Sequence, residues 1–193
     1  MSDLSQIIVI TLAIGGIFLY FPVNRIKAPG RWFFQDTRLD AYIPLVPYFV
    51  IPYIALYPYI IVTMIAMLFT SYAEMYYTCM AIAAWSAALF WYFFPAGMLR
   101  RREIGPGLLS HMIVWLHQND HENNTIPSSH VFYALICSYF FALAFPSYMI
   151  LFAAVGLLIS ASTVLVKQHH IADILGGILW TVASIVLAQY LVV

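Results

Sequence analysis

The stretch SYMILFAAVGLLISASTVLV, residues Ser147 to Val166, contains no charged side chain and decides the fold class. A helix of about 20 mostly apolar residues is long enough to cross the hydrocarbon core of a bilayer. Polar side chains return abruptly after it, at Lys167 to His170. The stretch therefore predicts a membrane-spanning helix with a polar cluster at its carboxyl end.

The composition of the whole chain agrees with a membrane protein. Of the 193 residues, 64% are hydrophobic and 8% are charged, so the chain lacks the polar surface that a water-soluble domain of this length needs. The formal net charge is zero, which gives no sign of a nucleic-acid partner. We therefore expect the bilayer to be the main surrounding of this protein.

Six stretches approach the length of a spanning helix, between clusters of polar or helix-breaking residues. Pro52 and Pro58 predict a kink or an irregular start in the second of them. No repeat or linker divides the chain, so we expect one all-α membrane domain over residues 1–193, a bundle of six transmembrane helices. The expected spans are Ile7 to Val23, Phe49 to Thr70, Met75 to Pro95, Ser129 to Phe145, Ser147 to Val166 and Ala172 to Val193.

Two longer segments lie outside these spans. The first, Asn24 to Asp40, is charged and aromatic, as is typical of chain in the headgroup region. The second, Ala96 to Ser128, contains apolar residues at helical spacing from Leu108 to Leu116, which predicts a short interfacial helix. Counting six spans places both segments, and the junction after the fifth span, at the same membrane surface.

The junction after the fifth span contains the sharpest candidate site. His169 and Asp173 are four residues apart, so on a helix they would share a face, and the carboxylate could hold one imidazole nitrogen. The other nitrogen would then be free to attack an electrophile, and the carboxylate would stabilise the charge that builds on the ring. The alternative is that His169 and His170 only anchor a helix end at the interface.

The run Pro127-Ser128-Ser129-His130 opens the fourth expected span. Ser128 or Ser129 can cap the helix, and the N–H groups of a first helical turn form a natural anion site. His130, in that turn, could donate a proton to a departing alkoxide. The alternative is a plain helix cap without chemistry.

Together the two runs resemble the type 2 phosphatidic acid phosphatase and haloperoxidase superfamily. The family's Pro-Ser-Gly-His motif is matched by Pro127-Ser128-Ser129-His130, with serine in place of glycine. Its Ser-Arg-x5-His-x3-Asp motif is matched from Ser162 to Asp173, with Thr163 in place of arginine. The spacing between the motifs and the six-span layout are similar to those of the membrane branch. Leu39-Asp40 and the proline-rich start of the second span look closest to the inositol phosphorylceramide synthase-like subgroup.

The resemblance implies a role for each matched residue. His169 would be the nucleophile that forms a phosphohistidine, Asp173 its orienting partner, and His130 the acid that protonates the leaving group. Ser128, Ser129 and Ser162 would lie against the phosphate. The family's first motif is matched poorly, with Phe93 where lysine is expected and Arg101 where proline is expected. The cations are therefore expected among Arg100, Arg101, Arg102 and Lys167.

The resemblance implies an enzyme of lipid metabolism that uses no metal and no cofactor. If water attacks the phosphohistidine, the protein is a lipid phosphatase that hydrolyses a lipid phosphomonoester or diphosphate. If a lipid hydroxyl attacks, it is a lipid phosphotransferase that moves a phosphoryl or phospho-headgroup. We favour hydrolysis, because the compact chain has no extra domain to organise a second substrate. The sequence identifies neither the lipid nor the oligomeric state.

Two other classes of function stay open. His111, His117 and His121, with Asp120 and Glu122, could form a divalent metal site, because His117 and His121 have the spacing of helical ligands. A solvated loop or a substrate gate are the alternatives for that segment. A channel or scaffold without catalysis is the second rival.

The membrane side of the site stays open as well. All eight Lys and Arg residues fall on the face that carries the candidate site, so the positive-inside rule places that face in the cytoplasm. Members of the resembled family usually face away from the cytoplasm. We expect an integral, multi-pass protein of the cell membrane with its site at one surface, on a side that the sequence leaves undecided.

Overall fold

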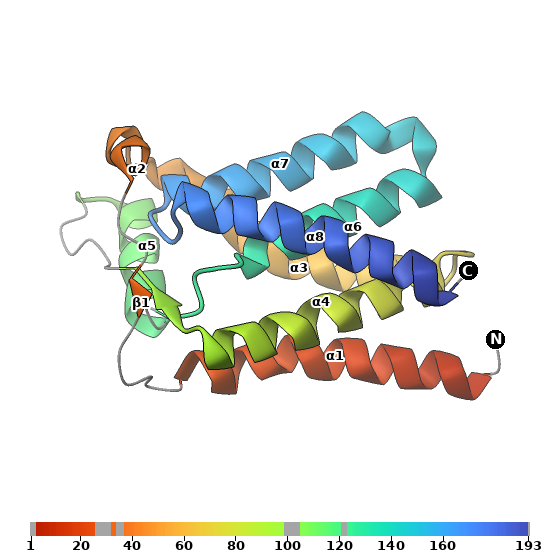
Figure 1. Ribbon diagram of the computed structural model, residues 1–193. Coiled ribbons are helices and arrows are strands. Elements are labelled where there is room, and N and C mark those ends of the chain that lie inside the picture. Colours follow the sequence, from red (N-terminus) through yellow and green to blue (C-terminus); the bar gives the residue numbers. More distant parts are fainter. Residues whose placement is uncertain (1–2, 26–31, 34–36, 99–104, 121–122, 193) are drawn as a thin grey trace.

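The computed structural model describes residues 3–25, 32–33, 37–98, 105–120 and 123–192, and this part of the chain is almost entirely helical (Figure 1). A two-residue parallel pairing joins β1 (Trp32–Phe33) to β2 (Ala96–Gly97). The α-helices are α1 (Asp3–Arg25), α2 (Arg38–Tyr42), α3 (Val50–Met67), α4 (Ala73–Phe93), α5 (Leu108–Asn119), α6 (Ser129–Ala144), α7 (Met149–Leu165) and α8 (Ile171–Val192).

Four helical segments are long and apolar enough to cross a membrane: Leu4–Arg25, Pro47–Met67, Pro146–Leu165 and Ile171–Val192. They correspond to the first, second, fifth and sixth expected spans. A 3-10 turn at Pro47–Phe49 precedes α3, so this span has an irregular start, but the irregularity lies at Pro47, while Pro52 and Pro58 lie within α3. The helices α4, of 21 residues, and α6, of 16 residues, run alongside these four (Figure 1).

The helix α6 forms the centre of the bundle. It packs against α3, α7 and α8, and most of its residues are buried. Gly177 of α8 allows a close approach, because a Cβ atom there would lie 2.7 Å from Val131 Cβ. On the other side, α4 buries a stripe of alanines, including Ala83 and Ala87, between α1 and α8. Small residues at such contacts let membrane helices approach closely.

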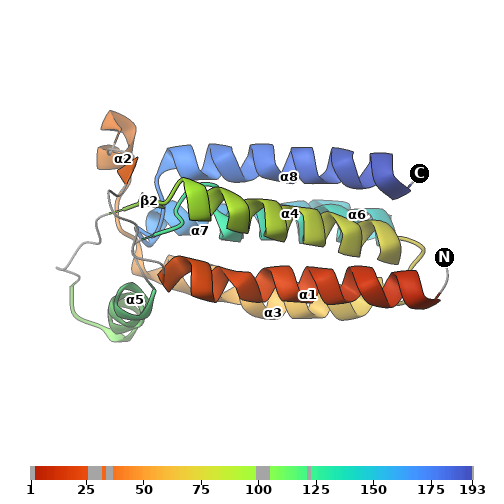
Figure 2. The ribbon, with the colours of Figure 1, turned by 60° about the horizontal axis from the view of Figure 1, so that its bottom comes forward.

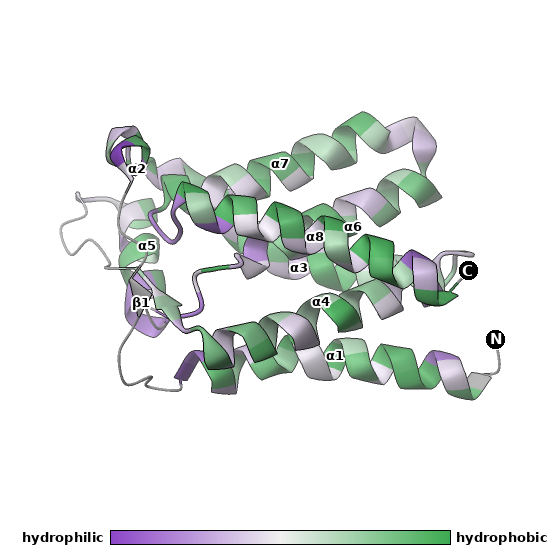
Figure 3. Cartoon of the chain, in the orientation of Figure 1, coloured by the Kyte–Doolittle hydropathy of each residue, from purple (hydrophilic) through white to green (hydrophobic). Residues whose placement is uncertain are grey.

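The polar elements gather at one end of the bundle, opposite the two chain termini (Figures 1 and 2). This end contains α2, α5, the loop before α6 and the connection between α7 and α8, while apolar residues dominate the helices themselves (Figure 3). The short helix predicted from Leu108 to Leu116 is present as α5, which buries Ile113 and Leu116 and exposes Trp115. The prediction that these distant polar segments lie together at one end is therefore confirmed for the described residues.

Candidate functional site

The connection between α7 and α8 is a tight turn that carries His169. The helix α7 ends at Leu165, and Lys167 has a φ of +57°, in the left-handed region that reverses the chain. The N–H groups of Gln168 and His169 both donate to the carbonyl of Thr163, at 2.9 and 3.2 Å. These bonds turn the chain back on the last turn of α7. His169 therefore has a fixed backbone position directly before α8.

His169 and Asp173 are in contact, but not in the way that their spacing predicted. His169 lies outside α8, so the two residues do not share a face of one continuous helix. Asp173 is in the first turn of α8, and its Oδ2 accepts from the backbone N–H of His170 at 2.8 Å. This is the carboxylate half of a capping box, in which the third helical residue reaches back to the residue before the helix. The helix start therefore fixes the carboxylate.

The same Asp173 oxygen lies 3.3 Å from Nδ1 of His169. Both side chains are buried. A carboxylate at Nδ1 holds the imidazole in one tautomer and orientation, with Nε2 as the nitrogen available for chemistry. The 3.3 Å separation is long for a hydrogen bond, as catalytic contacts often are before substrate binds. The arrangement is suited to activating a histidine nucleophile.

The amino terminus of α6 lies directly against this turn. Ser128 occupies the N-cap position, and its backbone N–H donates to the carbonyl of Asp173 at 3.2 Å, which joins the two sequence motifs. The predicted capping by the Ser128 hydroxyl is wrong, because this side chain makes no hydrogen bond to the first turn. Its Oγ is buried and has no hydrogen-bond partner among the described residues. A buried, unpaired hydroxyl at a helix amino terminus suits an anion.

The ring of His130 is held next to His169. It stacks on Tyr53, with ring centroids 4.0 Å apart and planes 16° apart, and it meets the edge of Tyr57 at 5.9 Å. The centroids of the His130 and His169 rings are 6.3 Å apart. One phosphoryl group could therefore contact both imidazoles. Sequence reasoning missed Tyr53 and Tyr57 as contacts of His130, because no pattern in the sequence links the tyrosines of α3 to α6.

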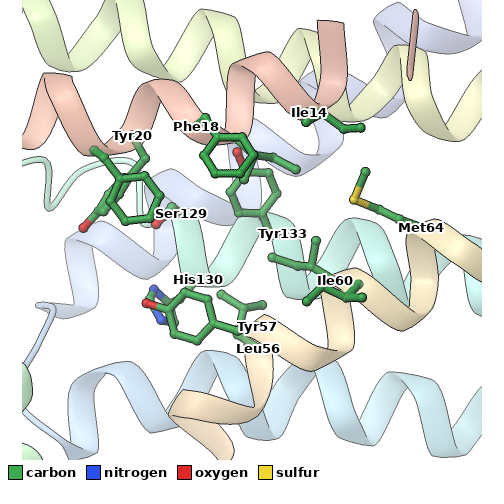
Figure 4. Close-up of a pocket in the computed structure, with 13 residues that line it drawn as sticks. Ile14, Phe18, Tyr20, Leu56, Tyr57, Ile60, Met64, Ser129, His130 and Tyr133 are labelled. Carbon is green, nitrogen blue, oxygen red and sulfur yellow. The ribbon is translucent and has the colours of Figure 1, made fainter. Parts of the chain in front are cut away.

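The remaining predicted phosphate contacts take different positions. Ser129 and His130 both line an apolar cavity (Figure 4). The Ser162 hydroxyl donates to the carbonyl of Ile159 at 2.5 Å, within α7, which leaves only its oxygen lone pairs for another group. The ammonium of Lys167 donates to the backbone carbonyl of Asp40 at 3.1 Å, so this contact connects it to α2. Arg100, Arg101 and Arg102 lie outside the described residues, so the source of the phosphate-binding cation stays a prediction.

Asp40 is a functional candidate that sequence reasoning missed. Its Oδ1 accepts from the N–H of Ile171, the first residue of α8, at 2.8 Å. Its Oδ2 accepts from the Thr37 backbone N–H at 2.9 Å, and the Asp40 N–H donates to the Thr37 hydroxyl oxygen at 3.2 Å, which completes a capping box at the start of α2. Burial alone would raise the pKa of this carboxyl, but the hydrogen bonds from Thr37 and Ile171 and the nearby His170 lower the pKa below its ordinary value. The Thr37-x-x-Asp40 spacing was the available signal for the α2 cap.

The described residues of the alternative metal site do not lie together in the structure. The Nε2 atom of His117 lies 3.1 Å from the carbonyl of Val166, whereas Nδ1 of the exposed His111 lies 2.7 Å from the carbonyl of Gly107. Asp120 accepts from Tyr20 and Asn24 of α1. Within the described ranges, no group of three potential metal-ligating side chains occurs. His121 and Glu122 fall outside these ranges.

Searches against protein-family models, curated proteins and solved structures found no match to this chain. The resemblance read from the motifs therefore stays a prediction. The structure shows that the two motifs lie close together in space. The His169 turn, the Asp173 carboxylate and the amino terminus of α6 converge at one end of the helical bundle.

Proposed function

We propose that this protein is an integral membrane lipid phosphatase that works through a phosphohistidine at His169. The observation that carries the proposal is the pairing of His169 with the buried Asp173 beside His130, at the amino terminus of α6. A nucleophile with an orienting carboxylate, a second histidine in reach and a helix amino terminus are the parts that phosphoryl transfer requires. Their place at the end of long apolar helices favours a lipid phosphate as substrate.

The proposal includes six spans. The helix α4 has 21 residues, which suffices to cross, although it is not among the four helices that length and hydropathy single out. The 16 residues of α6 correspond to about 24 Å, less than the hydrocarbon core of about 30 Å. Because α6 is surrounded by α3, α7 and α8, its amino terminus can stay below the membrane surface. The site would then lie at the interface, where phosphate headgroups are found.

The proposed reaction has two steps. In the first, Nε2 of His169 attacks phosphorus, an N–P bond forms and the P–O bond to the lipid breaks. The leaving oxygen takes a proton from His130. In the second, water gives a proton to His130 as its oxygen attacks phosphorus, and the N–P bond to His169 breaks. This releases inorganic phosphate and restores both histidines. Asp173 stabilises the positive charge on His169, and the first-turn N–H groups of α6 stabilise the phosphoryl oxygens.

The test is phosphate release from a panel of lipid phosphates in detergent micelles containing excess chelator. We expect release by the unmodified protein and none by His169→Ala. The matched control is His111→Ala, which removes an exposed histidine of α5 at the same end of the molecule and should leave release unchanged. Lack of release from every lipid, or release that survives His169→Ala, would refute the proposal. Lipid acceptors added to the same assay would detect transfer in place of hydrolysis.

A further inference from the structure

A largely apolar cavity of about 290 Å³ lies between α1, α3 and α6 (Figure 4). Ile14 and Phe18 of α1 and Ile60 of α3 contribute to its apolar walls. Ser129 and His130, at the start of α6, form part of the same lining. A hydrocarbon-lined space therefore ends at the proposed proton donor, and the phosphatase mechanism gives this space no role.

The cavity is closed toward the bundle and open to the outside. Its floor includes Leu56 and Ile60, whose side chains are 2% and 8% exposed. Its rim includes Phe18 and Ile61, which are 63% and 58% exposed. The opening exists because α1 packs mainly on α4 and α3 packs mainly on α6 and α7. In a bilayer, this open side would face lipid.

The long direction of the cavity follows the helices. On α3 the lining extends from Leu56 to Met64, and on α1 it extends from Phe21 back to Ile14, as expected for antiparallel neighbours. These segments of eight and nine helical residues extend about 10–12 Å along their helix axes. That is about a third of the hydrocarbon thickness of a bilayer. The cavity therefore runs parallel to a lipid chain, and its length matches the third of that chain nearest the headgroup.

A second cavity of about 310 Å³, called the polar cavity here because its lining is more polar than that of the first, adjoins the apolar one and shares Tyr20, Phe21 and Tyr57 with it. In this second cavity, Oδ1 of Asp120 accepts from the Tyr20 hydroxyl at 2.9 Å and from Asn24 at 2.8 Å. The side chains that make it polar are Asn24, Arg25, Asn119 and Asp120. The two cavities together change from hydrocarbon to hydrogen-bonding groups, as a lipid does from chain to headgroup.

We propose that the apolar cavity binds one hydrocarbon chain of the lipid phosphate substrate, with the phosphate at the end of the cavity where Ser129 and His130 line it. This assignment of the occupant as substrate rests on the proposed function. It gives the substrate class as a phosphate ester with at least one long chain, while a second chain would remain in the bilayer. The chain would position the ester oxygen next to His130.

The first test uses two tryptophan substitutions on α3. Ile61→Trp fills the rim of the cavity, and Ile65→Trp is the matched control, because Ile65 is 56% exposed, lies one turn further on and is not part of the lining. We expect Ile61→Trp to lower kcat/KM for a long-chain alkyl phosphate roughly tenfold and to leave that for butyl phosphate unchanged. Equal effects of the two variants, or an equal loss on both substrates, would overturn the proposal.

The second test does not depend on catalysis. An alkyl phosphate with a photoactivatable diazirine in its chain is irradiated with the protein in lipid nanodiscs, and the labelled residues are found by mass spectrometry. We expect labels concentrated on Phe18, Ile60 and Met64. Labels spread equally over outward-facing positions such as Ile8 and Ile65 would overturn the proposal. Concentrated labels without any phosphate release would instead support the cavity and refute the phosphatase.

Discussion

Asp173→Asn separates the proposed catalytic role of the Asp173 carboxylate from its structural role. Oδ2 of Asp173 contacts both Nδ1 of His169 and the N–H of His170, and Oδ1 has no hydrogen-bond partner among the described residues. Asparagine can place its carbonyl oxygen where Oδ2 lies and its NH₂ group where Oδ1 lies. The geometry is then kept, and only the negative charge is lost.

The expected loss of rate follows from that charge. Hydrogen bonds to charged groups contribute about 1.5–3 kcal/mol and neutral ones about 0.5–1.5, a difference of about 1–2 kcal/mol. This corresponds to about 5- to 30-fold in rate. A full charge pair about 4 Å apart at an effective dielectric constant of about 20 would contribute about 4 kcal/mol, or about a thousandfold. We therefore expect phosphohistidine formation to slow by a factor between these limits.

The assay is single-turnover formation of the phosphoenzyme, with an alkaline quench because phosphohistidine is labile in acid. Thermal unfolding in detergent is the control, and Asp173→Asn should unfold close to the unmodified protein. Asp173→Ala should be less stable, because it leaves the buried N–H of His170 unpaired at a cost of about 1–3 kcal/mol. A rate for Asp173→Asn equal to that of the unmodified protein would show that the carboxylate is only a helix cap.

Two further predictions concern stability. Because the Asp40 carboxyl has a lowered pKa in the folded state, its contribution is fully present above the ordinary pKa of about 4 and is lost as the pH falls through the lower folded-state value. Asp40→Asn should therefore destabilise the protein by about 1 kcal/mol at neutral pH, with a difference that shrinks in acid; a constant difference in pH-dependent unfolding would contradict this. Gly177→Ala should cost about 1–3 kcal/mol, because its Cβ would lie 2.7 Å from Val131 Cβ. Gly15→Ala, whose Cβ would come no closer than 4.0 Å to its neighbours, is the control, and equal melting temperatures would refute the packing argument.

Hydrophobic length was enough to predict most of the fold. The long helices and the irregular start of α3 were visible, because apolar runs and prolines act locally. The short amphipathic α5 was visible for the same reason, since its apolar residues recur at helical spacing. The contact between α6 and α8 could not be predicted from the sequence, because the close approach at Gly177 depends on how two distant helices pack.

The candidate site was predictable as a set of residues and less so as a geometry. The spacing of His169 and Asp173 indicated contact, but the chain makes that contact through a turn. The turn depends on a left-handed Lys167, a conformation that costs about 1–3 kcal/mol for residues other than glycine. Its support comes from Asp40, 127 residues earlier in the chain, which no local pattern could show.

The contacts that fix the start of α8 also fix the position of His169. Asp173 accepts from the His170 N–H, and Asp40 accepts from the next N–H, at Ile171, so the start of α8 is held by two carboxylates. The first of these carboxylates also contacts His169. Any movement of α2 away from α8 would therefore shift the helix start and His169, the proposed nucleophile, together. The helix cap does not exclude the proposed catalytic role, because the capping carboxylate of Asp173 also contacts His169.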